Sequence, residues 1–293
     1  MIRVNPEIVK SNFEIAQKYL ESRGVKASVM QKHFYGSLCI DEALDGSYYQ
    51  LWGQHYGSFN YLIGKSLELN ADYAGGIVSS IEEAVQLRDK YTTAEKPFKG
   101  YIPFNWNDDR EGLDFEEGVA LLQVCNSIQN EYFNCSNVMI TAGCLHDNVP
   151  SNSKFFELCE QLRFFGCENV SVGGSFWLQV SNFHPIVEEC RLGEFIIYGT
   201  IPFLSREDTI KGSPAIKVEL PILQVHKTRK QVVVAGGSTY FDAKNSEVLT
   251  KGFTFIQQST EYTILSYEDT LTVNSGDKIE FLPDYHSLIK ILK

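Results

Sequence analysis

The sequence has none of the local cysteine and histidine patterns that hold structural metals or form redox pairs. Its seven cysteines are scattered without a Cys-x-x-Cys pair, and its six histidines show neither His-x-His nor His-x-x-x-His spacing. Zinc sites and thioredoxin-like motifs depend on such spacings, so we expect no metal site. Reduced, mostly buried thiols are then expected, as in a cytoplasmic protein.

Long apolar runs and clusters of positive charge are missing as well. No stretch approaches the roughly 18 apolar residues of a membrane span, and the first residues contain no apolar signal core. The 26 Lys and Arg against 37 Asp and Glu give a formal net charge of −11. Nucleic acids and anionic membranes favour clustered Lys and Arg, so we expect neither as a partner.

The residues that are present can form a large core. Hydrophobic residues make up 43% of the 293 residues and aromatic residues 13%. This length and composition suit one large domain, or a barrel with a smaller partner domain.

Strand-like and helix-like segments alternate over the first 200 residues. Asn5 and Pro6 predict the start of a helix, Gly24 its end, and residues 26–30 form a strand. Further strands are expected at 73–78, 101–106, 138–142, 170–172 and 195–198, with helices starting at Ser79 or Ser80, Phe115 and about Ser153. This pattern predicts a parallel sheet under crossover helices, as a (β/α)₈ TIM-type barrel or, alternatively, an open doubly wound sheet. Residues 39–69 receive no assignment.

The pattern changes after Pro202, where β-runs follow one another without helices. These runs are residues 216–225, 232–235, 253–257, 262–267, 271–273 and 279–282. Turn residues separate several of them, which predicts a small β domain. We expect a barrel over residues 1–210 and a β domain over residues 211–293.

Lys32 lies at the C-terminal end of the first predicted barrel strand. Barrel active sites lie at the C-terminal ends of the strands, so this lysine is expected to point into the site. A desolvated lysine loses part of its proton affinity and becomes a nucleophile towards an aldehyde. The alternative from position alone is a surface lysine in a loop.

Several segments match one enzyme superfamily in their order along the chain. They are Gln31-Lys32-His33 with its flanks, Asp109-Arg110-Glu111-Gly112, Thr141-Ala142-Gly143-Cys144, Gly173-Gly174-Ser175, Arg191-Leu192-Gly193-Glu194, residues 234–242 and residues 276–285. Together they resemble the fold-type III pyridoxal phosphate (PLP) enzymes of the alanine racemase superfamily, in particular the ornithine-racemase-like branch. The resemblance covers nearly the whole chain, although each motif alone is weak.

The resemblance implies roles for two residues at the cofactor ring. Lys32 would hold PLP covalently and act as one of two proton-transfer groups. Arg191 would hydrogen-bond the pyridine nitrogen; because arginine stays protonated, the ring would remain a weak electron sink, which suits racemisation. The alternative for Arg191 is a salt bridge with Glu188, Glu189 or Glu194.

The resemblance also implies a phosphate site. Ser175 and the backbone N–H groups near Gly193 and Glu194 would bind the phosphate, with hydroxyls from Tyr35 and Tyr285. Glycine at strand ends allows close approach of the backbone to an anion, although a Gly-Gly-Ser sequence is also an ordinary turn.

Substrate-binding and second-base residues are less clearly marked. Arg110 matches an arginine that contacts the substrate carboxylate, and its alternative is an exposed partner for Asp108 or Glu111. A second acid/base is required on the other face of the cofactor, where the family uses a tyrosine from the partner subunit. The candidates are Tyr240, His286, Cys144 and His146.

The sequence therefore predicts a PLP-dependent racemase or epimerase of a free amino acid, acting as a homodimer. One alternative is a D-amino-acid lyase of the same fold, but such lyases carry a metal on a His-x-Cys pair near the C-terminus. Here Leu288 stands two positions after His286. A second alternative is a non-catalytic PLP carrier, whose known examples lack a β domain.

Overall fold

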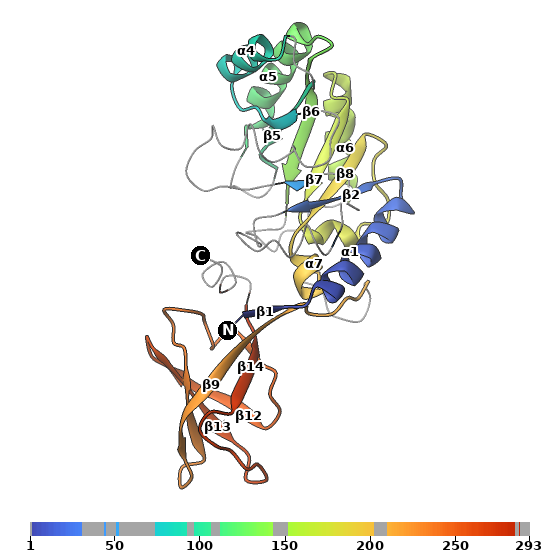
Figure 1. Ribbon diagram of the computed structural model, residues 1–293. Coiled ribbons are helices and arrows are strands. Elements are labelled where there is room, and N and C mark those ends of the chain that lie inside the picture. The colour runs from blue at the N-terminus through green and yellow to red at the C-terminus, as the bar shows by residue number, and fades with distance from the viewer. Residues whose placement is uncertain are drawn as a thin grey trace.

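The computed structural model describes residues 2–30, 44, 51–52, 74–92, 97–106, 112–142, 152–201, 210–284 and 287. These residues form two lobes (Figure 1). One lobe is a parallel sheet flanked by helices, and the other is a set of antiparallel strands.

Seven parallel strands form the sheet of the first lobe, in the order β3-β2-β8-β7-β6-β5-β4. Their bounds are Lys26–Met30 (β2), Leu51–Trp52 (β3), Ala74–Ile77 (β4), Phe98–Phe104 (β5), Phe133–Thr141 (β6), Asn169–Gly173 (β7) and Val187–Leu192 (β8). The first and last of them are neighbours, paired from Lys26 with Glu189 to Val29 with Leu192.

Pairing of the first strand with the last makes the sheet curl as in a (β/α) barrel. In a doubly wound sheet the first strand would instead lie beside a middle strand, so that alternative is wrong. The expected eight-stranded closed barrel is not seen either: within the described residues there are seven parallel strands, and β3 and β4 are not paired with each other.

The helices of this lobe connect the strands, and side chains cap two of them. They are α1 (Pro6–Glu21), α4 (Ile81–Lys90), α5 (Phe115–Ile128), α6 (Asn152–Phe164), the 3₁₀ turn η2 (Ser175–Gln179) and α7 (Glu194–Tyr198). The Asn5 side chain accepts hydrogen bonds from the backbone N–H of Glu7 and Ile8, which confirms the predicted start of α1. Ser80 caps α4 by accepting from the N–H of Glu83.

One sequence assignment in this lobe is wrong, and one strand was missed. Residues 195–198, expected as a strand, belong to the helix α7, and the last parallel strand is β8 at Val187–Leu192. A run of four apolar residues does not distinguish a buried helix from a buried strand. The β8 strand has no apolar run that would predict it, because it contains three charged residues, Glu188, Glu189 and Arg191.

The second lobe is antiparallel, in the order β11-β14-β9-β10-β13-β12, with β1 also paired to β9. Its strands are β1 (Ile2–Val4), β9 (Ile216–His226), β10 (Gln231–Ala235), β11 (Glu247–Val248), β12 (Phe253–Gln258), β13 (Tyr262–Tyr267) and β14 (Lys278–Leu282). Residues 271–273, expected as a strand, lie between two turns, one closed by Leu271 N–H on Glu268 O and the other joining Asn274 and Asp277.

Each lobe has its own hydrophobic core. The first core lies between the parallel sheet and its helices and includes Phe13, Phe133 and Trp177. The second lies inside the antiparallel lobe, where Phe241 and Phe281 pack edge to face. All five cysteines in the described part of the chain are buried and free. No helix in the described ranges is long and apolar enough to cross a bilayer.

Candidate functional site

Arg191 lies near the C-terminal end of β8 and is 1% exposed. Its Nη1 donates to the carbonyl oxygen of Ser171 at 3.0 Å and to the Ser171 hydroxyl at 2.5 Å. Its Nη2 donates to the carbonyl oxygen of Ile140 at 3.2 Å and to the Thr141 hydroxyl at 3.3 Å. Bonds to β6 and β7 therefore fix the plane of the guanidinium group.

Two glycines at the end of β7 make room for this arginine. A Cβ atom on Gly173 would lie 2.6 Å from Nη2 of Arg191, so any side chain there would displace the guanidinium group. Gly174 has a φ of +116°, a conformation that residues with a Cβ rarely adopt. Its N–H donates to the carbonyl oxygen of Arg191 at 3.1 Å, which joins the two strand ends.

Ser175 lies directly beyond these glycines and is buried. Its hydroxyl oxygen accepts a hydrogen bond from the backbone N–H of Phe195 at 2.8 Å. Phe195 follows Gly193 and Glu194, where the chain turns from β8 into α7. Because the Ser175 oxygen accepts here, its hydrogen can be donated to another group. The structure thus brings Ser175 and Arg191 close to the turn at Gly193 and Glu194.

Glu189 lies two residues before Arg191 and is fully buried. Its carboxylate accepts hydrogen bonds from the hydroxyl of Ser171 at 2.5 Å and from the hydroxyl of Ser28. Burial raises the pKa of this carboxyl, against the opposing effects of the Arg191 charge and the two serine bonds. Ser171 therefore contacts both Glu189 and Arg191.

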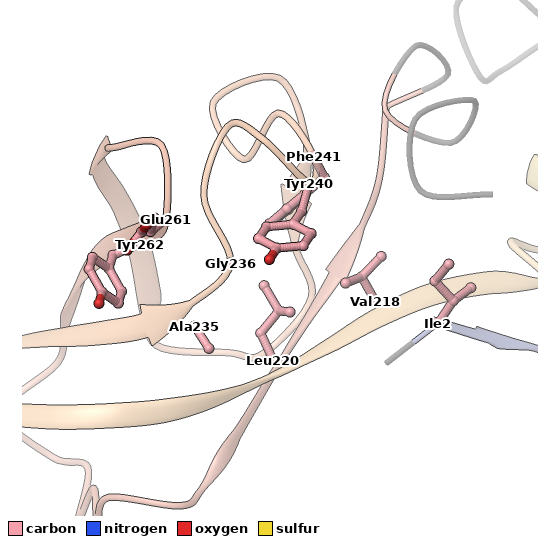
Figure 2. Close-up of a pocket in the computed structure, with 9 residues that line it drawn as sticks. All are labelled: Ile2, Val218, Leu220, Ala235, Gly236, Tyr240, Phe241, Glu261 and Tyr262. Atoms are coloured by element: carbon pink, nitrogen blue, oxygen red, sulfur yellow. The ribbon is translucent and has the colours of Figure 1, made fainter. Parts of the chain in front are cut away.

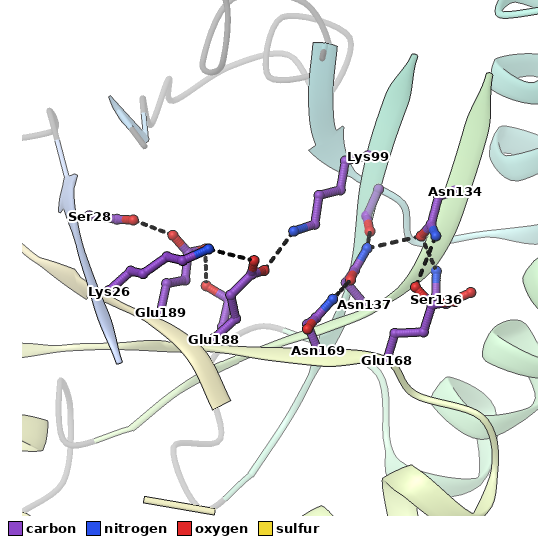
Figure 3. A network of polar contacts seen from close by, with 12 residues as sticks. Lys26, Ser28, Lys99, Asn134, Ser136, Asn137, Glu168, Asn169, Glu188 and Glu189 are labelled. Carbon is purple, nitrogen blue, oxygen red and sulfur yellow. Dashed lines mark hydrogen bonds and ion pairs between the residues drawn. The ribbon is translucent and has the colours of Figure 1, made fainter. Parts of the chain in front are cut away.

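Glu188 belongs to a different set of contacts, shown with Glu189 in Figure 3. Its carboxylate pairs with Nζ of Lys26 at 3.3 Å and with Nζ of Lys99 at 2.6 Å. The pairing of β7 with β8 shifts by one residue here, from Val170–Val187 to Ser171–Glu189. This β-bulge allows two consecutive carboxylates to contact groups on the same face of the sheet.

Tyr240 lies in the antiparallel lobe, away from the Arg191 site. It is 63% exposed and lines an apolar groove of about 710 Å³ together with Leu220, Phe241 and Tyr262 (Figure 2). All residues that line this groove come from the antiparallel lobe, Ile2 of β1 included. Within one described chain, the structure does not bring Tyr240 to Arg191.

The remaining predicted site residues fall outside the described residues. They are Lys32, Tyr35, Arg110, Cys144, His146, Tyr285 and His286. In the part of the chain that is described, no three His, Cys, Asp or Glu side chains gather into a group that could hold a metal ion.

No protein-family model and no curated protein sequence matches the chain. Solved structures do match it over its full length. Alanine racemase from Clostridium difficile 630, in complex with cycloserine, has a TM-score of 0.72 at 14% identity, covering 100% of this chain and 92% of its own. The chain has the fold of alanine racemase.

A second alanine racemase and an aldolase have the same fold. Alanine racemase from Bartonella henselae, with covalently bound pyridoxal phosphate, gives a TM-score of 0.72 at 14% identity, over 100% of this chain and 96% of that one. D-threonine aldolase from Filomicrobium marinum gives 0.71 at 14% identity, over 100% and 89%. The alanine racemase fold therefore does not distinguish a racemase from a lyase.

The residues around Arg191 fit PLP in their chemistry. A buried arginine can only donate hydrogen bonds, which suits an unprotonated pyridine nitrogen. Gly173 and Gly174 leave space where a Cβ atom would fill it, and the Ser175 hydroxyl and nearby backbone N–H groups suit phosphate oxygens.

Sequence reasoning missed the residues that support Arg191. Ser171 and Thr141 contact the guanidinium group, and Glu189 contacts Ser171. Thr141 was used only as part of a matched segment, and Glu189 only as one of three direct salt-bridge partners. Glu189 and Arg191 are two residues apart on one strand, so their side chains lie on the same face of the sheet. This spacing could have indicated that the two side chains are close to each other. The bridging serine depends on strand register, which the sequence does not reveal.

Proposed function

We propose that this chain is a PLP-dependent enzyme that acts at the α-carbon of an amino acid, and more specifically a racemase or epimerase. The observation that carries the proposal is the buried guanidinium of Arg191 beside Gly173, Gly174 and Ser175, within the alanine racemase fold. Bound PLP would withdraw electrons from the α-carbon and so labilise the α-proton.

Arg191 would donate a hydrogen bond to the pyridine nitrogen. Its two terminal nitrogens are held by Ser171, Ile140 and Thr141, so the group is oriented before a ligand arrives. An arginine in this place keeps the ring nitrogen unprotonated, which favours reversible proton removal over deeper electron withdrawal. This property supports racemisation.

The phosphate would bind where β7 and β8 end. Ser175 would donate its hydroxyl hydrogen, and the backbone N–H groups of Gly193 and Glu194 would complete the site. Tyr35 and Tyr285 would add hydroxyl donors. The Gly174 N–H is bonded to the Arg191 carbonyl, so the ends of β7 and β8 are neighbours, which supports placing the phosphate and the ring nitrogen in one site.

Lys32 would bind the cofactor covalently and move one of the two protons. It follows β2, the direct neighbour of β8, by two residues. Arg110 would bind the substrate carboxylate. Tyr240 of a second copy is the proposed second acid/base, because this residue is exposed in the antiparallel lobe. His286, Cys144 and His146 are the other candidates.

The whole-molecule proposal is a homodimer of barrels, each with a site that is shared with the partner. The neighbouring position of β2 and β8 supports closure of the sheet as a full (β/α)₈ barrel. We place the division from the β domain at about residue 210, shortly before β9 begins at Ile216.

A D-amino-acid lyase is the second candidate function. D-threonine aldolase from Filomicrobium marinum and D-threo-3-hydroxyaspartate dehydratase from Delftia sp. HT23 match this chain with TM-scores of 0.71 and 0.69. Against it stands the sequence around His286, which has no cysteine two positions further on.

The cofactor proposal is tested on purified protein incubated with PLP. We expect a visible absorption band. Dialysis should remove this band only after an amine that competes for the aldehyde is added. Borohydride reduction should attach PLP permanently to Lys32, which the mass of the peptide containing Lys32 would show. Lys32→Ala should remain colourless, whereas the helical control Lys18→Ala should colour like wild type. Protein that never gains colour would overturn the proposal.

The reaction is then tested with a panel of D- and L-amino acids in deuterated water. A racemase incorporates deuterium at the α-carbon and interconverts the enantiomers without loss of amino acid. A lyase consumes D-3-hydroxy amino acids, and chelators would reduce its activity if it needs a metal. PLP binding without exchange in any amino acid would leave a carrier and contradict an enzyme.

A further inference from the structure

We propose that Glu189, acting through Ser171, positions Arg191 and balances its charge at the cofactor ring. This inference rests on the proposed function, because it assigns a role towards bound PLP. It makes Glu189 a positioning residue, since its carboxylate contacts Ser171 and Ser28 and reaches the ring only through Arg191.

The direction of the hydrogen bonds along this chain of groups is fixed. A guanidinium group has only donors, so the Ser171 oxygen must accept from Nη1 of Arg191. The single hydrogen of that hydroxyl is then donated to Oε1 of Glu189. The serine therefore connects the cation and the anion in one sense only, and polarisation of one bond strengthens the other.

Burial requires a counter charge for Arg191. Its guanidinium is 1% exposed, and the groups on β6 that it contacts, the Ile140 carbonyl and the Thr141 hydroxyl, are neutral. An uncompensated buried cation is costly, whereas one that is paired and hydrogen-bonded is tolerated. Glu189, with no exposed surface, supplies that negative charge one serine away.

Glu189 also links the two strands that lead into the proposed site. Its second oxygen accepts from Ser28 of β2, and Lys32 follows β2 in the sequence. Ser28 pairs directly with Arg191 in the β2–β8 register. The Glu189 carboxylate on β8 therefore connects β2 and β7 to β8, two residues before Arg191.

Glu188 provides a matched control on the same strand. It is a partly exposed carboxylate on the same face of the sheet, and it pairs with Lys26 and Lys99 (Figure 3). Neutralising Glu188 removes one negative charge from this face of the sheet, as neutralising Glu189 does. Only the second change removes a negative charge that is hydrogen-bonded to Arg191 through Ser171.

The test measures the bound cofactor's absorption as a function of pH in Glu189→Gln, Glu188→Gln and wild type. Glutamine keeps the shape and can still bond to both serines. Loss of a negative charge near the cofactor disfavours its cationic form, so the pH midpoint should fall by about one unit in Glu189→Gln. It should fall by less than half of that in Glu188→Gln.

A second variant separates positioning from charge. Ser171→Ala keeps the Glu189 carboxylate but removes the bridging hydroxyl, so Arg191 loses one of its fixing bonds. We expect its dissociation constant for PLP, read from equilibrium absorbance titrations of apoprotein, to rise about 10-fold. The pH midpoint should move little. This variant also decides the question if Glu189→Gln does not fold.

The inference would be overturned if Glu189→Gln had the pH midpoint and PLP affinity of wild type, or if Glu188→Gln shifted the pH midpoint by the same amount as Glu189→Gln. In both cases wild-type protein that binds PLP would still support the proposed function. If Glu189→Gln is insoluble, unchanged affinity in Ser171→Ala overturns it instead. A wild type that does not bind PLP overturns both.

Discussion

The guanidinium group of Arg191 determines which residues can stand around it. It lies under the end of β7, where only a residue without a Cβ fits beside Nη2. Its donors select acceptors from three chain positions, Ser171, Ile140 and Thr141. Glycine at position 173 is thus explained by contact with an arginine, in addition to the space that an anion would need.

Gly173→Ala should therefore weaken PLP binding. The added methyl group would lie 2.6 Å from Nη2 of Arg191 and would turn the guanidinium group away from the ring nitrogen. We expect the dissociation constant for PLP to rise at least about 10-fold, measured by absorbance titration of apoprotein.

Gly100→Ala on β5 is the control for this change. Its added methyl group would also lie 2.6 Å from a neighbour, in this case the Sγ atom of buried Cys135, away from Arg191. It should lower the melting temperature and leave PLP affinity near the wild-type value. Equal affinity losses in both variants would mean that general strain, not Arg191, is responsible.

Part of the site can be predicted at this scale. The Arg191-Leu192-Gly193-Glu194 and Gly173-Gly174-Ser175 segments indicate neighbouring groups, and the structure brings them together. The role of Ser171 could not be predicted, because it depends on the one-residue shift between β7 and β8. A bulge of this kind leaves no signature in the composition of either strand.

The elements follow the sequence where their ends are marked by specific residues. Asn5 and Ser80 begin helices as predicted, because their side chains satisfy N–H groups that have no partner within the helix. Unmarked elements were missed: β1 is three residues long, β8 carries buried charges, and α7 is too short to show a helical period. The structure of these three elements depends on their packing against other parts of the fold.

One buried side chain holds α1, α7 and the segment before β9 together. Asn12 of α1 donates to the carbonyl oxygens of Ile196 and Ser213 at 2.9 and 2.7 Å and accepts from the Ser213 N–H at 2.9 Å. A Cβ atom on Gly212 would lie 2.2 Å from the Asn12 oxygen, so the segment passes close to this side chain.

Asn12→Leu should destabilise the protein by about 2–3 kcal/mol, because the buried Ile196 carbonyl and the two part-buried backbone groups of Ser213 lose the side chain that bonds them. Asn5→Ala, which removes the helix cap at the exposed end of the same helix, should cost only about 1 kcal/mol. Urea unfolding followed by circular dichroism would measure both. An Asn12→Leu loss no larger than that of Asn5→Ala would contradict the assigned tie between α1 and α7.

The proposed cofactor-binding residues and the proposed second acid/base lie in different lobes of the molecule. Arg191 and Ser175 belong to the parallel lobe, whereas Tyr240 lies on the surface of the antiparallel lobe in an apolar groove (Figure 2). The first strand of the chain, β1, also lies in the antiparallel lobe, paired with β9. If Tyr240 is the second acid/base, it must act on the site of another copy.

Mixing two inactive variants tests this arrangement. Lys32→Ala removes the proposed covalent anchor, and Tyr240→Phe removes an exposed hydroxyl, which should lower activity about 100-fold or more without changing the melting temperature. After unfolding and refolding together in equal amounts, half of the dimers pair one variant with the other. Each such dimer has one site with both Lys32 and Tyr240 intact, so activity should return to about one quarter of wild type.

The result depends on which copy supplies the tyrosine. If Tyr240 served the site of its own chain, every site in the mixed dimer would carry one of the two changes, and mixing would restore nothing. If Tyr240 took no part, Tyr240→Phe alone would be fully active, and His286 and Cys144 would become the next variants to examine. Recovery of about one quarter therefore requires both a shared site and a catalytic hydroxyl at Tyr240, because neither property alone produces it.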